Sequence, residues 1–229
     1  MFWQEPTLTP TRGLSERVVD LSFRINCRTL PLDHAYPLSE AILAMLPWLA
    51  EELDAGIHLI HGAASGNGWT RPDDPTRELL HLSRRTRLTL RLPRERLDDA
   101  LRLSGATLPI AGHLLRVETP SVRVLSPSDT LFARYVVAAE HEDEQCFVEQ
   151  AVAALADRHI QVRKLLCGMT HSIATPQARI FTRSVMVAGL NPEESLLLQQ
   201  KGLGPARKLG CGLFVPHKGV EPVGTSIQH

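Results

Sequence analysis

The alternation of apolar and polar residues in the first half of the chain predicts the element order strand, helix, strand, strand, helix, strand. Residues 18–25 alternate with the period of a half-buried strand. Residues 38–53 place leucine and isoleucine on one helix face, and Pro47 should kink or split that helix. The other predicted elements are strands at 56–62 and 81–93, a helix at 94–105 that ends on glycine, and a strand or hairpin at 107–117.

The second half of the chain repeats this order. Its predicted elements are strands at 131–140, 162–169, 178–190 and 212–216, and helices at 147–160 and 192–204. The last helix begins with Pro192, Glu193 and Glu194, a combination that suits a helix N-terminus. Two such units in tandem predict an α+β protein with two ferredoxin-like (RRM-like) domains, at 1–126 and 127–229.

Composition agrees with two domains and adds a charge pattern. A chain of 229 residues with 43% hydrophobic residues can form two compact cores. Lysine plus arginine equals aspartate plus glutamate at 25 each, so the net charge does not attract nucleic acid. The charge is segregated, however: residues 84–102 contain seven arginines and three acids, and residues 201–218 contain four cations and no acid. Binding of a polyanion should therefore depend on these two segments.

Cysteine spacing and hydropathy indicate where in the cell the protein works and which cofactors it could bind. The four cysteines lie far apart without a CxxC pair, which favours reduced, buried thiols over a zinc knuckle or a redox pair. His58 and His61 resemble a metal pair, but no third ligand lies at suitable spacing, so no metal and no other cofactor is expected. The N-terminus has no export signal, and no run of about 18 apolar residues occurs. We expect a cytoplasmic protein with no membrane partner.

The segment 201–218, KGLGPARKLGCGLFVPHK, connects the last predicted helix to the last predicted strand. Its four glycines allow positive φ values and close approach of the backbone to a partner, and its cations supply positive charge. This combination suits an anionic ligand that is held along the backbone. A plain surface loop that leads into the final strand is the alternative, and this stretch alone leaves both open.

These segments resemble a known family. The carrying residues are SLLLQQKGLGPARKLGCGLFVP near the C-terminus, with VVDLSFRI, LPLDHAYPL and GIHLIHG near the N-terminus. From about residue 17 to 217 the chain resembles the CRISPR-associated endoribonucleases that cut precursor CRISPR RNA within each repeat, the Cas six family, and it looks closest to the branch named for Myxococcus-type systems. The resemblance implies two tandem ferredoxin-like domains, RNA cleavage without a metal, and retention of the cut guide RNA in many systems.

Metal-free RNA cleavage uses the 2′-hydroxyl of the substrate as nucleophile, and it needs a base, an acid and a cation near the phosphate. Histidine suits the first two roles because its pKa lies near neutrality. The resemblance implies a catalytic histidine in or just after the first helix, which makes His58 the first candidate and His34 the second, with Tyr36 as a partner in proton transfer or phosphate contact. His61 is third, since in a strand it would point away from the face of His58. Structural or RNA-contact roles for His58, and a capping or hydrogen-bonding role for His34, remain open.

RNA binding is expected from the two basic segments. The glycine-rich loop should present backbone N–H groups and cations to phosphates, and the strand at 81–93 should present arginines on its polar face. The expected RNA-binding residues are Lys201, Gly202, Gly204, Arg207, Lys208, Gly210, Gly212, Arg84, Arg85, Arg87 and Arg91. Exposed strand arginines are also common on plain solvated surfaces, which is the alternative here.

The leading hypothesis is a metal-independent endoribonuclease that binds CRISPR repeat RNA and cuts precursor CRISPR RNA into guide RNA with 2′,3′-cyclic phosphate ends. Its expected partners are repeat or guide RNA and other subunits of a CRISPR effector complex. One alternative is a non-cleaving RNA-binding subunit that caps the repeat hairpin in such a complex. Another is a small-molecule enzyme, for which RNA affinity would be weak and nearly independent of salt.

Overall fold

The computed structural model describes residues 17–61 and 78–217. The first half of the chain forms an antiparallel five-stranded sheet with the order β3-β5-β1-β7-β6. Its strands are β1 (Val18–Asn26), β3 (Gly56–His58), β5 (Arg87–Pro93), β6 (Thr107–Ile110) and β7 (His113–Val124). A separate two-stranded sheet pairs β2 (Thr29–Pro31) with β4 (Leu79–His81).

The second half forms a four-stranded antiparallel sheet with the order β11-β8-β10-β9. Its strands are β8 (Thr130–Val137), β9 (Lys164–Ala174), β10 (Arg179–Ala188) and β11 (Val215–Pro216). If the four strands of each β-α-β-β-α-β unit are counted along the chain, their order across the sheet is 4-1-3-2 in both sheets. The first sheet has β6 as an additional strand at its edge. The predicted α+β fold with tandem ferredoxin-like units is confirmed. The predicted boundary at residue 126 lies in the connection between β7 and β8.

Helices cover one side of each sheet. They are α2 (Ala35–Met45), α3 (Leu97–Ala100), α4 (Glu144–Ala156) and α5 (Pro192–Lys201), with 3-10 turns η1 (Pro47–Ala50), η2 (Arg94–Arg96), η3 (Leu101–Leu103) and η4 (Arg207–Leu209). Pro47 splits the first predicted helix as expected, because η1 begins at that proline. The α5 N-terminus has a capping box, in which Asn191 and Glu194 each bond the other's backbone N–H.

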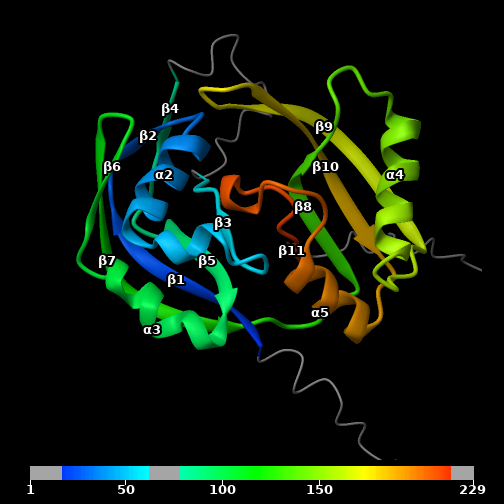
Figure 1. Ribbon diagram of the computed structural model, residues 1–229, viewed down its shortest axis with the longest axis horizontal. Coiled ribbons are helices and arrows are strands. Elements are labelled where there is room, and N and C mark those ends of the chain that lie inside the picture. Colours follow the sequence, from blue (N-terminus) through cyan, green and yellow to red (C-terminus); the bar gives the residue numbers. More distant parts are fainter. Residues whose placement is uncertain (1–16, 62–77, 218–229) are drawn as a thin grey trace, which may run out of the picture.

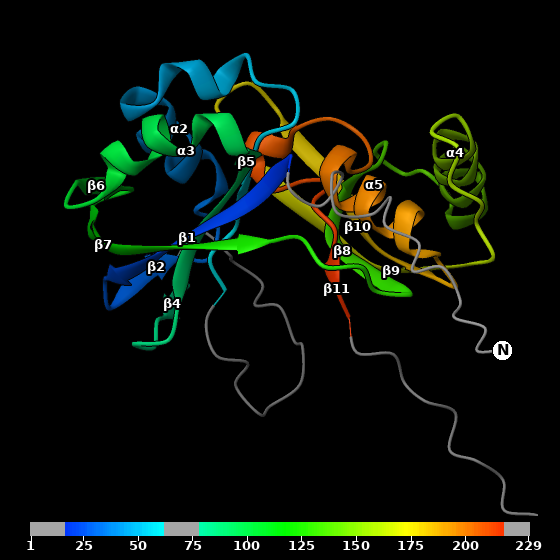
Figure 2. The same ribbon diagram turned by 90° about the horizontal axis from the view of Figure 1, so that it is seen from below.

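Each unit has its own apolar core. Leu21 and Phe23 of β1 pack under Leu38 and Ile42 of α2, and all four are fully buried. In the second unit Phe147 and Leu155 of α4 pack against Val185 of β10 and Leu198 of α5. Figure 1 shows α4 on the side of the second sheet that points away from the first half, and Figure 2 shows α2 and α3 above β1 and β7. The other face of the second sheet is therefore turned toward the first half.

Several strands are shorter than the sequence predicts. β3 ends at His58, so Leu59, Ile60 and His61 leave the sheet. The predicted strand at 81–93 is divided, because a turn closed by the bond from Thr86 N–H to the Ser83 carbonyl separates β4 from β5. The final strand is reduced to β11, since the glycine-rich loop keeps the preceding residues in turns. Figure 1 shows this glycine-rich loop between the two units.

Candidate functional site

Arg91 lies where the two units meet, and its guanidinium binds both of them. It donates from Nε and Nη2 to the Asp20 carboxylate on β1 at 2.8 and 2.9 Å. Its Nη1 donates to the carbonyls of Gln199 and Phe214 in the second unit at 2.9 and 2.7 Å. The side chain is 0% exposed. The prediction that Arg91 presents its guanidinium to RNA is therefore wrong, because the second unit covers this end of β5.

His58 belongs to the same buried group. Its Nε2 lies 3.7 Å from Asp20 Oδ1 and, among the described residues, has no hydrogen-bond partner. Burial lowers the pKa of His58, against the opposing effect of Asp20. Burial alone would raise the pKa of Asp20, but Arg91 and His58 hold it well below its usual range. Asp20, His58, Arg91 and Arg207, whose contacts follow, form what we call the junction cluster.

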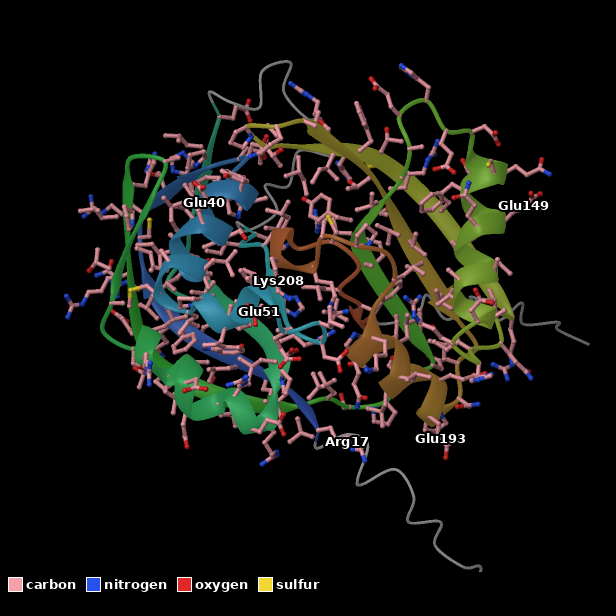
Figure 3. All side chains as sticks on the ribbon, in the orientation of Figure 1. Arg17, Glu40, Glu51, Glu149, Glu193 and Lys208 are labelled. Atoms are coloured by element: carbon pink, nitrogen blue, oxygen red, sulfur yellow. The ribbon has the colours of Figure 1, made fainter. Side chains whose placement is uncertain are left out.

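The cations of the glycine-rich loop bind the first unit rather than facing outward. Arg207 is buried, and its Nη2 donates to the carbonyls of Asp54 and Gln200 at 3.0 and 2.9 Å. Lys208 Nζ donates to the carbonyls of Glu52 and Ala55 at 2.5 and 2.7 Å. Figure 3 shows Lys208 in the middle of the molecule, close to the segment that carries Glu51. Burial lowers the pKa of Arg207 to about 10 and that of Lys208 to about 8, so both stay charged at neutral pH.

Lys201 is the more accessible cation of this loop. Its Nζ contacts both carboxylate oxygens of Asp54 at 3.0 and 2.8 Å, and 48% of its side chain is exposed. Lys218 lies outside the described residues. Of the loop cations seen in the structure, Lys201 is the one that can exchange its protein partner for a phosphate without leaving a buried position.

The loop glycines serve mainly internal packing. A Cβ on Gly202 would meet the Arg207 guanidinium and the Gly212 carbonyl, and one on Gly210 would come within 2.5 Å of Leu59. Gly212 is equally confined by the Leu203 backbone. Gly204 differs, because a Cβ there would meet nothing within 4 Å. Gly204 is thus the loop glycine whose backbone is open to a ligand.

His34 is a fixed structural ring. It is 2% exposed, its Nδ1 lies 3.0 and 3.2 Å from the Pro31 and Leu32 carbonyls, and its Nε2 accepts the Ile60 N–H at 3.1 Å. It does not cap its own helix. Both ring nitrogens are therefore occupied, which is the hydrogen-bonding role that the sequence left open and which disfavours proton transfer to a substrate. Burial lowers the pKa of His34, in keeping with a neutral ring.

Tyr36 is the second residue of α2 and is not paired with a histidine. Its hydroxyl donates to Glu40 Oε1 at 2.6 Å, which raises the pKa of Tyr36. Both residues line an open cavity of about 550 Å³ between α2 and the β9–β10 turn. The predicted partnership of Tyr36 with His34 is not formed here, although the tyrosine remains accessible to a ligand.

The arginines ahead of β5 form an exposed basic surface. Arg84 and Arg85 are exposed in the turn, and Arg87 Nη1 donates to the carbonyls of Arg84 and Thr86 at 3.1 and 3.0 Å. Arg24 of β1 lies directly opposite Arg87, and like charges in such a pair repel. The sequence analysis did not select Arg24, although its place on the polar face of the alternating strand at 18–25 was a signal for it.

A second group of polar rings lies on the face of the second sheet that α4 does not cover. The His61 ring stacks on Tyr135 of β8 with centroids 6.4 Å apart, and Tyr135 meets His171 of β9 edge-on at 5.4 Å. Arg134 of β8 and His171 line an adjoining cavity of about 240 Å³. We call His61, Arg134, Tyr135 and His171 the open-face cluster. Sequence reasoning missed it because its residues come from three distant segments.

In residues 17–61 and 78–217 no three histidine, cysteine, aspartate or glutamate side chains are grouped as metal ligands. In the same part of the chain no helix has the length and apolar character needed to cross a bilayer.

Comparison with known proteins gives one consistent result. A family model described as Cas6 Crispr matches residues 19–219. The chain is 37% identical over 198 residues to "CRISPR-associated endonuclease Cas6" of Myxococcus xanthus (strain DK1622), which covers 86% of this chain and 81% of that protein.

Solved structures share the fold at low sequence identity. "CRISPR associated protein Cas6" superposes with a TM-score of 0.60 and 10% identity over 88% of this chain and 100% of that chain. The protein in "Structure of Thermus Thermophilus Cse3 bound to an RNA representing a pre-cleavage complex" gives a TM-score of 0.51 and 14% identity over 87% and 98%.

Proposed function

Because this chain belongs to the Cas6 family, we propose that it binds CRISPR repeat RNA and cuts precursor CRISPR RNA within each repeat, without a metal ion. In this reaction the 2′-oxygen attacks the adjacent phosphorus and the 5′-oxygen leaves. The products are a 2′,3′-cyclic phosphate on one fragment and a 5′-hydroxyl on the next, which becomes the guide RNA.

The observation that carries this proposal is the family match, which spans both ferredoxin-like units from residue 19 to 219. The Myxococcus relative, which bears the name endonuclease, aligns over most of both chains, so the similarity is not confined to one domain. Two local features support RNA as the ligand of a chain without net charge: the arginines Arg84, Arg85 and Arg87 just ahead of and at the start of β5, and the cavity on the second sheet that Arg134 and His171 line.

Direct RNA contacts are proposed for the accessible members of the predicted set. Lys201 and Gly204 represent the glycine-rich loop, and Arg84, Arg85 and Arg87 represent the arginine segment. The remaining loop residues act through the junction, where they hold the two units together. Other subunits of a CRISPR effector complex are proposed as further partners, since guide RNA functions inside such complexes.

The test is incubation of the pure protein with a repeat hairpin RNA in excess EDTA, with mapping of the product ends. We expect one cut, a 2′,3′-cyclic phosphate and a 5′-hydroxyl. A 2′-deoxy nucleotide at the cut position should abolish cleavage while the dissociation constant changes little, because it removes the nucleophile but almost none of the binding surface.

Three outcomes would contradict parts of the proposal. Tight, strongly salt-dependent binding without any product would identify the chain as a non-cleaving RNA-binding subunit. Cleavage that requires added Mg²⁺ would refute the metal-independent reaction. Weak binding that does not respond to salt would remove RNA as the ligand.

A further inference from the structure

The open-face cluster brings together three rings that the sequence keeps far apart. His61 follows the end of β3 in the first unit, whereas Tyr135 lies on β8 and His171 on β9 of the second sheet. Tyr135 is in ring contact with both histidines, at centroid distances of 6.4 and 5.4 Å. Because both imidazoles contact the Tyr135 ring, they lie on one patch of the surface, where two proton-transfer groups could act on one bound phosphate.

Two adjacent residues at the start of α2 hold the segments that carry these histidines. His34 Nε2 accepts the N–H of Ile60, the neighbour of His61. Asp33 Oδ2 accepts the N–H of Ala174 at 3.0 Å, at the end of the strand that carries His171. The first unit therefore anchors the backbone beside His61 and the end of the strand that carries His171, although His171 belongs to the second unit. Such anchoring of flanking backbone is what a site needs if two groups must keep a set distance.

The patch is accessible and has a cation. His61 is exposed, and His171, Arg134 and Tyr135 are partly exposed. The cavity of about 240 Å³ beside them is lined by Phe132, Arg134, Met169, His171 and Ser184, so a phosphate placed there meets a guanidinium and a hydroxyl. By contrast, the His34 ring is enclosed and the His58 Nε2 is buried in the junction cluster.

The environment of His61 favours its neutral form. Although His61 as a whole is exposed, its ring stacks on Tyr135, and local desolvation first and the Arg134 charge second lower its pKa, with smaller effects from His34 and His58. A phosphate bound at Arg134 offsets that positive charge and brings the pKa back up. A neutral imidazole that becomes more basic when the substrate binds has the properties of a general base.

We propose that His61 and His171 are the proton-transfer residues of RNA cleavage, with Arg134 contacting the scissile phosphate and Tyr135 positioning the two rings. This inference rests on the proposed function. Neutral His61 takes the proton of the 2′-hydroxyl while the 2′-oxygen forms its bond to phosphorus. The bond from phosphorus to the 5′-oxygen breaks, and protonated His171 gives its proton to that oxygen. His61 ends protonated and His171 neutral, and exchange with water restores both.

The experiment measures single-turnover cleavage of repeat RNA, and its dissociation constant, for His61→Ala, His171→Ala and the control His113→Ala. His113 lies at the start of β7, on the edge hairpin of the first sheet. We expect each of the first two changes to slow cleavage by about 10² to 10⁴ with less than about threefold loss of affinity, and the control to cut normally. Added imidazole should restore part of the activity of His61→Ala. His34→Ala should also slow cleavage, but imidazole should not rescue it, because His34 acts on position.

A substrate with sulfur in place of the leaving 5′-oxygen separates the two roles. A thiolate leaves without protonation, so this substrate should restore His171→Ala and should leave His61→Ala slow. Because the loss of a ring that contacts Tyr135 can destabilise the protein, thermal unfolding of each variant is measured, and His61→Asn and His171→Asn serve as milder replacements.

If the wild type cuts and both alanine variants cut within about threefold of it, the present inference is wrong while the proposed function stands. Rescue of both variants by the sulfur substrate, or of neither, overturns the assigned roles. If the wild type does not cut repeat RNA at all, the proposed function fails and this inference fails with it.

Discussion

The junction cluster and the open-face cluster both contain histidine and arginine and differ in what surrounds them. In the junction cluster the second unit covers Arg91 completely, and the guanidinium donates its hydrogen bonds to Asp20 and two backbone carbonyls. In the open-face cluster Arg134 and His171 line a cavity that opens to solvent. Histidine and arginine in the first cluster stabilise the arrangement of the two units, whereas the same residues in the second can reach a substrate. The environment, more than the residue type, decides the role.

The strongest way to break this comparison is to remove the buried guanidinium. Arg91→Met leaves the Asp20 carboxylate and the carbonyls of Gln199 and Phe214 without their donor. We expect the free energy of unfolding, measured by urea denaturation, to fall by about 3–5 kcal/mol. Arg87→Met, four residues earlier on the same strand and partly exposed, should change it by less than about 0.5 kcal/mol. Equal effects of the two changes would mean that Arg91 does not join the units.

A pair of glycines tests whether the loop packs inward. Gly202 combines a φ of 64° with close contact to Arg207 and Gly212, whereas Gly204 has a φ of 75° and open space around it. Gly202→Ala should cost about 3 kcal/mol of unfolding free energy, from backbone strain plus overlap. Gly204→Ala should cost about 1–2 kcal/mol, from strain alone. If the two variants are equally stable in thermal and urea unfolding, the loop is not the internal clamp that these contacts describe.

The pH dependence of stability reports on the burial of His58. Because burial lowers the pKa of His58, the unfolded chain takes up a proton below its ordinary value of about 6.5 while the folded protein does not. The stabilisation is thus complete above about pH 6.5 and is lost as the pH falls toward the folded pKa. Each histidine that takes up a proton only on unfolding changes the free energy of unfolding by at most about 1.4 kcal/mol per pH unit. The pKa values of His34 and His61 are also lowered, so these residues add to the rise of stability with pH.

Urea denaturation of the wild type and His58→Gln at pH 5, 6 and 7 measures this slope. The variant should show a smaller rise in stability with pH, whatever its absolute stability. His113→Gln, on the edge hairpin of the first sheet, is the matched control for the loss of an imidazole. An unchanged slope in His58→Gln would show that this ring titrates alike in the folded and unfolded protein.

Much of the fold was accessible from the sequence, because the period of the apolar residues reports directly on burial. Alternation located β1, and its buried Leu21 and Phe23 lie on the predicted face. Alternation also assigned Arg91 to the polar face correctly, but it could not tell that a second unit covers this end of that face. What covers a polar face depends on contacts between distant segments, for which local spacing has no signal.

The candidate site was harder to predict for the same reason. The sequence selected His58 and His34 because they follow and precede the first helix, and both lie in the neighbourhood of the junction. The loop packs against β3 beside His58, as the close approach of Gly56 to Leu213 shows, and the Ile60 N–H meets the enclosed His34 ring. His171 had no neighbouring signal in the sequence, since its contact with Tyr135 forms only when β9 and β8 join one sheet.

The smallest expected effect concerns Lys201. This residue belongs to the glycine-rich loop at the junction, but its side chain is accessible to solvent. Its ion pair with Asp54 is half exposed, so a double-mutant cycle of Lys201→Met and Asp54→Asn should give a coupling of less than about 1 kcal/mol in unfolding free energy. Asp54 also competes with phosphate for this ammonium group. Asp54→Asn should therefore tighten repeat-RNA binding by about two- to fivefold at low salt, and Lys201→Met should cancel the gain and reduce the salt slope by about one. If Asp54→Asn tightens binding equally in the Lys201→Met background, the gain comes from the lost negative charge alone, and Lys201 does not contact the RNA.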